Sequence, residues 1–201
     1  MKYALFSFFA SSLIFIGCEP NANSSSEEVE VQIEEVDTVD YLKEGQQMAT
    51  QTQMILGKNL MKAIQSQGTE YAVSFCSNEA IHLTDSMALA LNARLKRVSD
   101  KNRNPNNKAS EAELAYINQV KTAISEGKMA KPQLTKSGNK RIGYYPIFTD
   151  KRCMQCHGSP ESDISPSTLS KINDLYPDDQ AKGYQPEQLR GIWVVEMDKT
   201  N

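Results

Sequence analysis

Two cysteines and a histidine stand close together in the C-terminal third of the chain, in the order Cys153-Met154-Gln155-Cys156-His157. A Cys-x-x-Cys-His sequence is the attachment signal for a c-type haem. The spacing suits this chemistry because each thiol can form a thioether with one vinyl group of the porphyrin, and the adjacent histidine then falls beneath the iron. We therefore expect one covalent haem c, held by Cys153 and Cys156, with His157 as the proximal iron ligand.

The N-terminus indicates export. Lys2 precedes an apolar run from Tyr3 to Gly17, which is shorter than the about 20 residues that a membrane-spanning helix needs. A small residue directly before Cys18 resembles a bacterial lipobox, although Phe15 stands where that pattern more often has leucine. We expect residues 1–17 to be a lipoprotein signal peptide and Cys18 to carry the lipid, on the periplasmic side of a bacterial membrane or at the cell surface. The alternative is an uncleaved anchor with an incidental cysteine.

The next segment, residues 18–38, is rich in serine and acidic residues and has no apolar periodicity. This composition is typical of a flexible, solvated tether. Residues 39–201 then form a single predicted haem-binding domain. The net charge of -3 argues against a nucleic-acid partner, because a phosphate backbone is bound chiefly by lysine and arginine.

Two other interpretations of the cysteine motif compete with haem. A zinc site needs about four ligands, and Cys153, Cys156 and His157 with Cys76 or His82 would supply them. A redox dithiol of the thioredoxin kind needs a βαβ context, which the sequence around Cys153 lacks. Export favours haem, because bacteria assemble c-type haem outside the cytoplasm.

Hydrophobic periodicity predicts helices followed by strands. The pattern of apolar residues and turn signals gives helices over 40–67, 69–91 and 110–126, a short strand over 94–99, a hairpin over 133–148 and a final strand over 191–197. Gly68 is the expected C-cap between the first two helices, and Ser110 with Glu113 makes a capping box. We therefore expect an α+β fold in which N-terminal helices pack on a small antiparallel sheet.

Cys76 is the cysteine that these assignments leave over. It falls on the apolar stripe of the second predicted helix, so it faces the core, whereas His82 lies some 120° around that helix. A free buried cysteine is often only a small hydrophobic residue. Other candidates for a distal iron ligand are His82 and the methionines Met48, Met54, Met61, Met87 and Met129. Met154 lies inside the haem loop and is excluded.

Several motifs resemble, in order, those of the Tll0287-like c-type haem proteins. They are Cys76-Ser77-Asn78-Glu79-Ala80, Arg103-Asn104-Pro105-Asn106-Asn107, Pro146-Ile147-Phe148, Cys153 to Gly158, the run from Tyr176 to Tyr184, and Leu189-Arg190-Gly191. The resemblance implies a PAS-like sheet. It also implies that Cys76 is the distal iron ligand, through its thiolate.

With both axial positions filled by the protein, substrate cannot reach the iron, so we do not expect an enzyme. Electron transfer to a separate redox protein is the favoured function, and a haem-based redox or gas sensor that signals through a separate partner is the alternative. Four arginines could pair with haem propionates, but solvent exposure is the simpler interpretation, and we do not include them in the predicted site: Arg97, Arg103, Arg152 and Arg190.

Overall fold

The computed structural model describes residues 39–200. The predicted signal peptide, Cys18 and the tether lie outside the described residues. The elements in chain order are α1 (Tyr41–Ala90), β1 (Arg94–Val98), η1 (Pro105–Asn107), α2 (Glu111–Ser125), β2 (Gln133–Ser137), β3 (Lys140–Phe148), η2 (Lys151–Cys153), α3 (Met154–His157), α4 (Pro166–Leu175) and β4 (Leu189–Asp198). Within the described part, no helix is both long and apolar enough to cross a membrane.

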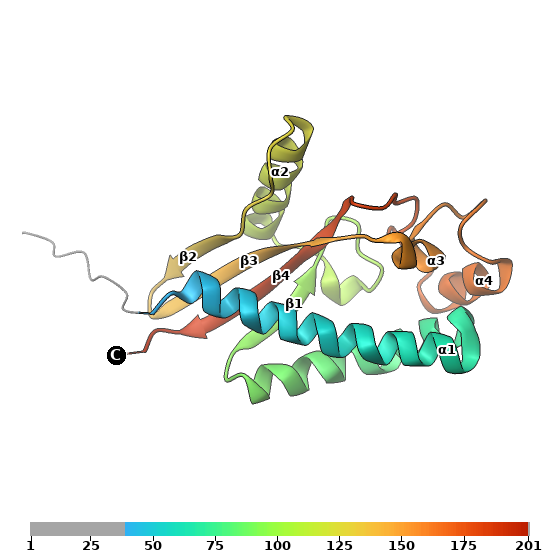
Figure 1. Ribbon diagram of the computed structural model, residues 1–201, viewed down its shortest axis with the longest axis horizontal. Coiled ribbons are helices and arrows are strands. Elements are labelled where there is room, and N and C mark those ends of the chain that lie inside the picture. Colours follow the sequence, from blue (N-terminus) through green and yellow to red (C-terminus); the bar gives the residue numbers. More distant parts are fainter. Residues whose placement is uncertain (1–38, 201) are drawn as a thin grey trace, which may run out of the picture. The chain divides into compact units, whose positions relative to one another are not determined.

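The long helix α1 consists of two arms that meet at Gly68. Gly68 has φ 81° and ψ 179°, a conformation that glycine adopts without the steric cost of a side chain. The chain turns back on itself at this point (Figure 1). The predicted break between two helices is thus confirmed, and both arms contribute side chains to the cavity described below.

The four strands form one antiparallel sheet in the order β1-β4-β3-β2. The sheet separates two apolar clusters, because successive side chains of a strand point to opposite faces. Trp193 and Val195 pack with residues of α1, whereas Ile192 and Val194 pack with Ile117 of α2. In Figure 1, α1 and α2 accordingly lie on opposite sides of the strands. The α+β prediction is confirmed, and the PAS-like resemblance stays a prediction.

The helix α4 was not predicted from the sequence. It begins after Ser165, whose hydroxyl accepts a hydrogen bond from the Thr168 N–H at 3.3 Å. Ile172 of α4 packs with Val73 of α1 in a third apolar cluster, and Cys156 borders that cluster. This helix therefore contributes to the apolar cluster against which Cys156 packs.

Candidate haem site

One cavity brings the predicted site residues together. It has a volume of about 700 Å³, and Cys76, Cys153, Cys156 and His157 all line it. Pockets for cofactors and ligands commonly fall between about 300 and 1,000 Å³. Its walls are largely apolar side chains of both α1 arms and of the sheet, which include Leu56, Leu60, Ile64, Val73, Phe75, Ile147 and Trp193.

A capped turn presents the two thiols of the motif. Asp150 accepts hydrogen bonds from the backbone N–H groups of Arg152 at 2.7 Å and Cys153 at 3.3 Å. Its carboxylate also pairs with the Arg152 guanidinium at 2.5 Å. The hydrogen bond from the Arg152 side chain is the main reason that the pKa of Asp150 falls to about 2. The turn η2 ends at Cys153 and continues into α3, which contains Cys156. The two cysteines are three positions apart and therefore lie on one side of the helical turn.

His157 is oriented and kept neutral. Its Nδ1 lies 2.8 Å from the carbonyl oxygen of Ala181. Because a carbonyl can only accept, Nδ1 carries the proton and Nε2 has a free lone pair. Burial, followed by the nearby charges of Arg103 and Arg190, holds the pKa of His157 well below its usual value. A histidine that donates one ring N–H to a backbone carbonyl is the usual arrangement of a metal-ligating imidazole.

Cys76 reaches the same cavity from the second arm of α1. It forms no disulfide, and neither do Cys153 and Cys156. Burial raises the pKa of the Cys76 thiol, while Arg97 and Arg103 oppose that shift. Burial also raises the pKa of Cys156 to about 11, and Cys76 contributes to this rise in the same direction.

The other proposed distal ligands differ in whether they line the cavity. His82 is exposed and does not line the cavity. Met48 lies in the core beneath the sheet, and Met129 is 83% exposed. Met54 and Met61 do line the cavity, whereas Met87 does not. Of the proposed distal ligands, Cys76, Met54 and Met61 therefore line the cavity that His157 also lines.

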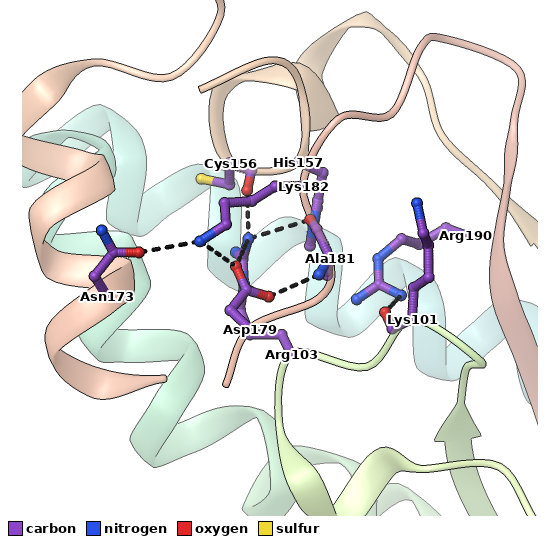
Figure 2. Close-up of polar contacts among 9 residues, drawn as sticks. All are labelled: Lys101, Arg103, Cys156, His157, Asn173, Asp179, Ala181, Lys182 and Arg190. Atoms are coloured by element: carbon purple, nitrogen blue, oxygen red, sulfur yellow. Dashed lines mark hydrogen bonds and ion pairs between the residues drawn. The ribbon is translucent and has the colours of Figure 1, made fainter. Parts of the chain in front are cut away.

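An ion pair that sequence reasoning missed fastens the motif to the rest of the domain. Arg103 donates to both carboxylate oxygens of Asp179, at 3.2 and 3.1 Å, and to the carbonyl oxygen of Cys156 at 2.5 Å. Asp179 in turn accepts the Ala181 N–H at 2.9 Å. Figure 2 shows this network from Arg103 through Asp179 to Ala181, next to Cys156 and His157. The available signal was the run from Tyr176 to Tyr184, which contains Asp179 and Ala181 and carried part of the family resemblance.

The zinc alternative lacks a ligand set. In the part of the chain that the structure covers, residues 39–200, no three histidine, cysteine or acidic side chains are grouped closely enough to hold a metal ion. Three free thiols and one neutral imidazole around a large apolar cavity instead suit a planar, largely apolar cofactor that supplies its own metal.

Comparisons with known proteins agree with the motif pattern. The family model described as "Tll0287-like: Tll0287" matches residues 20–197. The solved structure titled "Crystal structure of the cyanobacterial heme-protein Tll0287" matches with a TM-score of 0.51 and 20% sequence identity, over 63% of this chain and 73% of that chain. At this identity the structural match demonstrates a shared fold. No curated protein matches the chain. Because the family model spans most of the sequence, the chain belongs to the Tll0287-like family.

Proposed function

We propose that the protein is an exported, lipid-anchored monohaem protein of the c type that transfers electrons. The observation that carries this proposal is the single cavity lined by Cys153, Cys156, His157 and Cys76. The name of the solved relative, a heme-protein, supports the choice of cofactor. When bound, a haem would supply a one-electron couple at its iron.

The residues around the cavity have separate tasks in this proposal. Cys153 and Cys156 hold the porphyrin covalently, and His157 offers its unprotonated Nε2 to the iron because Nδ1 is committed to Ala181. Cys76, on the second arm of α1, would offer a sulfur ligand to the iron. Two protein ligands would keep substrates from the iron, so the role is electron transfer and not catalysis. An anionic sulfur ligand also favours the ferric state and lowers the midpoint potential.

Covalent attachment is tested by denaturing electrophoresis of the full-length protein with a haem stain. The stain should stay on the polypeptide in the wild type and in Cys76→Ser, which keeps both attachment thiols. It should be lost or strongly reduced in Cys153→Ser and Cys156→Ser. Complete extraction of the haem from wild-type protein by acid acetone would contradict the proposal.

Electron transfer has a separate test on the same holoprotein. Spectroelectrochemical titration should give one reversible one-electron transition, with the same absorption spectra on reduction and reoxidation. Mixing the reduced protein with an oxidised small c-type cytochrome of higher potential should reoxidise it quickly. A haem that cannot be cycled reversibly would contradict an electron-transfer role while leaving the haem assignment intact.

The lipid anchor is also a proposal, since Cys18 lies outside the described residues. It is supported by the apolar run that stops at Gly17-Cys18. The native protein should fractionate with membranes, and Cys18→Ser should release it into the soluble fraction with its haem retained. A wild-type protein that is wholly soluble with an unmodified Cys18 would exclude the anchor.

A further inference from the structure

The cavity contains more positive charge than its protein groups neutralise. Its lining includes one acidic side chain, Asp150, which is already paired with Arg152. It also includes five basic side chains: Lys58, Arg97, Arg103, Arg152 and Arg190. Arg103 is paired with Asp179. Lys58 is exposed to solvent. The two basic side chains whose surroundings remain to be described are Arg97 and Arg190.

Arg97 lies on β1 and points to the cavity side of the sheet. It is opposite Trp193 of β4 in the strand pairing, and its guanidinium lies over the Trp193 ring, 5.4 Å from the centroid. No carboxylate within residues 39–200 lies within ion-pair distance of it. Burial lowers its pKa, Cys76 opposes that shift, and the positive charge of Arg190 adds to it.

Arg190 is turned toward the cavity by an irregularity in β4. Ile147 pairs with Gly191 while Phe148 pairs with Leu189, so Arg190 is an extra residue in the ladder. Such bulges re-aim side chains and are frequent beside functional sites. Leu189 then packs with the apolar cluster on the α2 face, and Arg190 joins Gly191 in the cavity lining.

The Arg190 guanidinium is incompletely bonded. One Nη donates to the carbonyl oxygen of Lys101 at 3.0 Å, and the group lies over the Tyr184 ring. Its Nε–H is buried without a hydrogen-bond partner, and no other buried side-chain nitrogen or oxygen of the described residues shares this state. Asp179 acts on Arg190 electrostatically, but both its oxygens are bonded to Arg103. A buried donor without a partner is costly, so it points to a ligand acceptor.

Two unneutralised guanidinium groups on neighbouring strands of one cavity require two anionic groups. The positive charge of Arg190 lowers the pKa of Arg97, and that of Arg103 lowers the pKa of Arg190. Planar guanidinium groups bind carboxylates with paired hydrogen bonds, which gives both energy and orientation. A haem carries two carboxylates on one edge of an otherwise apolar ring, which matches a cavity with apolar walls and two neighbouring arginines.

We propose that Arg97 and Arg190 bind the two propionate carboxylates of the haem. This inference rests on the proposed haem function. It gives the haem a direction in the cavity, with its carboxylate edge at the β1 and β4 strands and its vinyl groups toward Cys153 and Cys156. The two arginines are positioning residues that also raise the midpoint potential, because a nearby positive charge stabilises the reduced state.

The test uses full-length holoprotein carrying haem with ¹³C-labelled propionate carboxylates. Redox-difference infrared spectra and midpoint potentials are compared for wild type, Arg97→Gln, Arg190→Gln and Lys58→Gln. Both arginine variants should keep a covalent haem, shift the labelled carboxylate bands and lower the midpoint potential. Lys58→Gln removes one positive charge at the same cavity and should reproduce the wild-type bands.

The outcomes separate the two proposals. If wild-type protein carries no covalent haem, the proposed function fails and this inference fails with it. If haem is present but both arginine variants give wild-type carboxylate bands and potentials, or if only Lys58→Gln shifts them, the arginine assignment is wrong. If the glutamine variants do not retain haem, Arg97→Lys and Arg190→Lys replace them in the test, because lysine preserves the positive charge. The lysine variants should show shifted carboxylate bands and a midpoint potential near that of the wild type. Unshifted bands in the lysine variants would also overturn the assignment.

Discussion

Arg103 and Asp179 form a bidentate ion pair across 76 positions of sequence, and it joins the loop after β1 to the loop after α4. The Asp179 side chain is 0% exposed and that of Arg103 is 13% exposed. The pair also reaches the candidate ligand, because Arg103 holds the Cys156 carbonyl and Asp179 holds the Ala181 N–H. The Ala181 carbonyl then orients His157. The orientation of the imidazole therefore depends on residues distant from it in sequence.

Replacing Asp179 with alanine should destabilise the domain strongly. Arg103 would be left buried without its counter-charge, and breaking a buried pair in this way costs about 3–5 kcal/mol. Chemical denaturation of the holoprotein, followed by circular dichroism, measures the change. Asp178→Ala is the matched control, because Asp178 is the exposed neighbour and its loss should change stability by less than about 0.5 kcal/mol. Equal stability of the two variants would show that the ion pair does not hold the two loops together.

Glu113 should make stability depend on pH. Burial opposes its ionisation, but hydrogen bonds from Lys96 and Ser110 outweigh burial and hold its pKa below the ordinary 4.5. Lys96 lies 2.7 Å from the carboxylate, and the Ser110 N–H lies at 2.8 Å. A lowered pKa in the folded state means that the ionised form stabilises the fold above about pH 4.5, and that this stabilisation is lost as the pH falls through the folded-state value.

Glu113→Gln should therefore lower the free energy of unfolding at pH 7 by about 1.5 to 3 kcal/mol, as expected for hydrogen bonds to a charged group. The difference from wild type should shrink as the pH falls below 4.5. Urea denaturation across the acid range measures it. Glu111→Gln, at an exposed position in the same helical turn, should show no such convergence. A difference for Glu113→Gln that stays constant with pH would mean that the ionised carboxylate contributes no stability.

The helices and strands could be predicted largely from local patterns. The break at Gly68, the helix after Ser110 and the hairpin around Gly138 each depend on residues close in sequence, whose turn and capping preferences act locally. The helix α4 was missed because its ten residues contain few apolar positions. Ile172 is one of the few that it buries, against Val73 from a remote part of the chain.

The candidate site also contains residues that could be predicted from local sequence and residues that could not. The haem motif could be predicted from the sequence, because the spacing of Cys153, Cys156 and His157 is itself the chemical signal. Asp179 and Ala181 had no local signature of a role, since each acts through a contact made only when the loops meet. The exclusion of His82 and the retention of Met54 and Met61 also required the three-dimensional cavity, because periodicity places a residue on a helix face but does not say what that face encloses.

The assignment of Cys76 as the distal ligand gives the most demanding prediction. Its support is the family motif around it and its place in the lining of the cavity that also holds His157. Oxidised wild-type protein should show low-spin iron with a thiolate signature in electron paramagnetic resonance. Cys76→Ala should abolish that signature and leave the covalent haem in place. Asn78→Ala, two positions farther along the helix and exposed, should keep the wild-type spectrum.

Two further measurements distinguish loss of a ligand from a general disturbance of the cavity. Carbon monoxide should bind the reduced Cys76→Ala protein faster than wild type, because the sixth position is open. The midpoint potential should rise, because an anionic sulfur that favours the ferric state has been removed. An unchanged spectrum would refute Cys76 and direct attention to Met54 and Met61, which line the same cavity. If Cys76→Ala fails to fold, Cys76→Ser keeps nearly the volume of the side chain but is a much weaker ligand. The serine variant must then lose the thiolate signature, because its hydroxyl has no sulfur to donate to the iron.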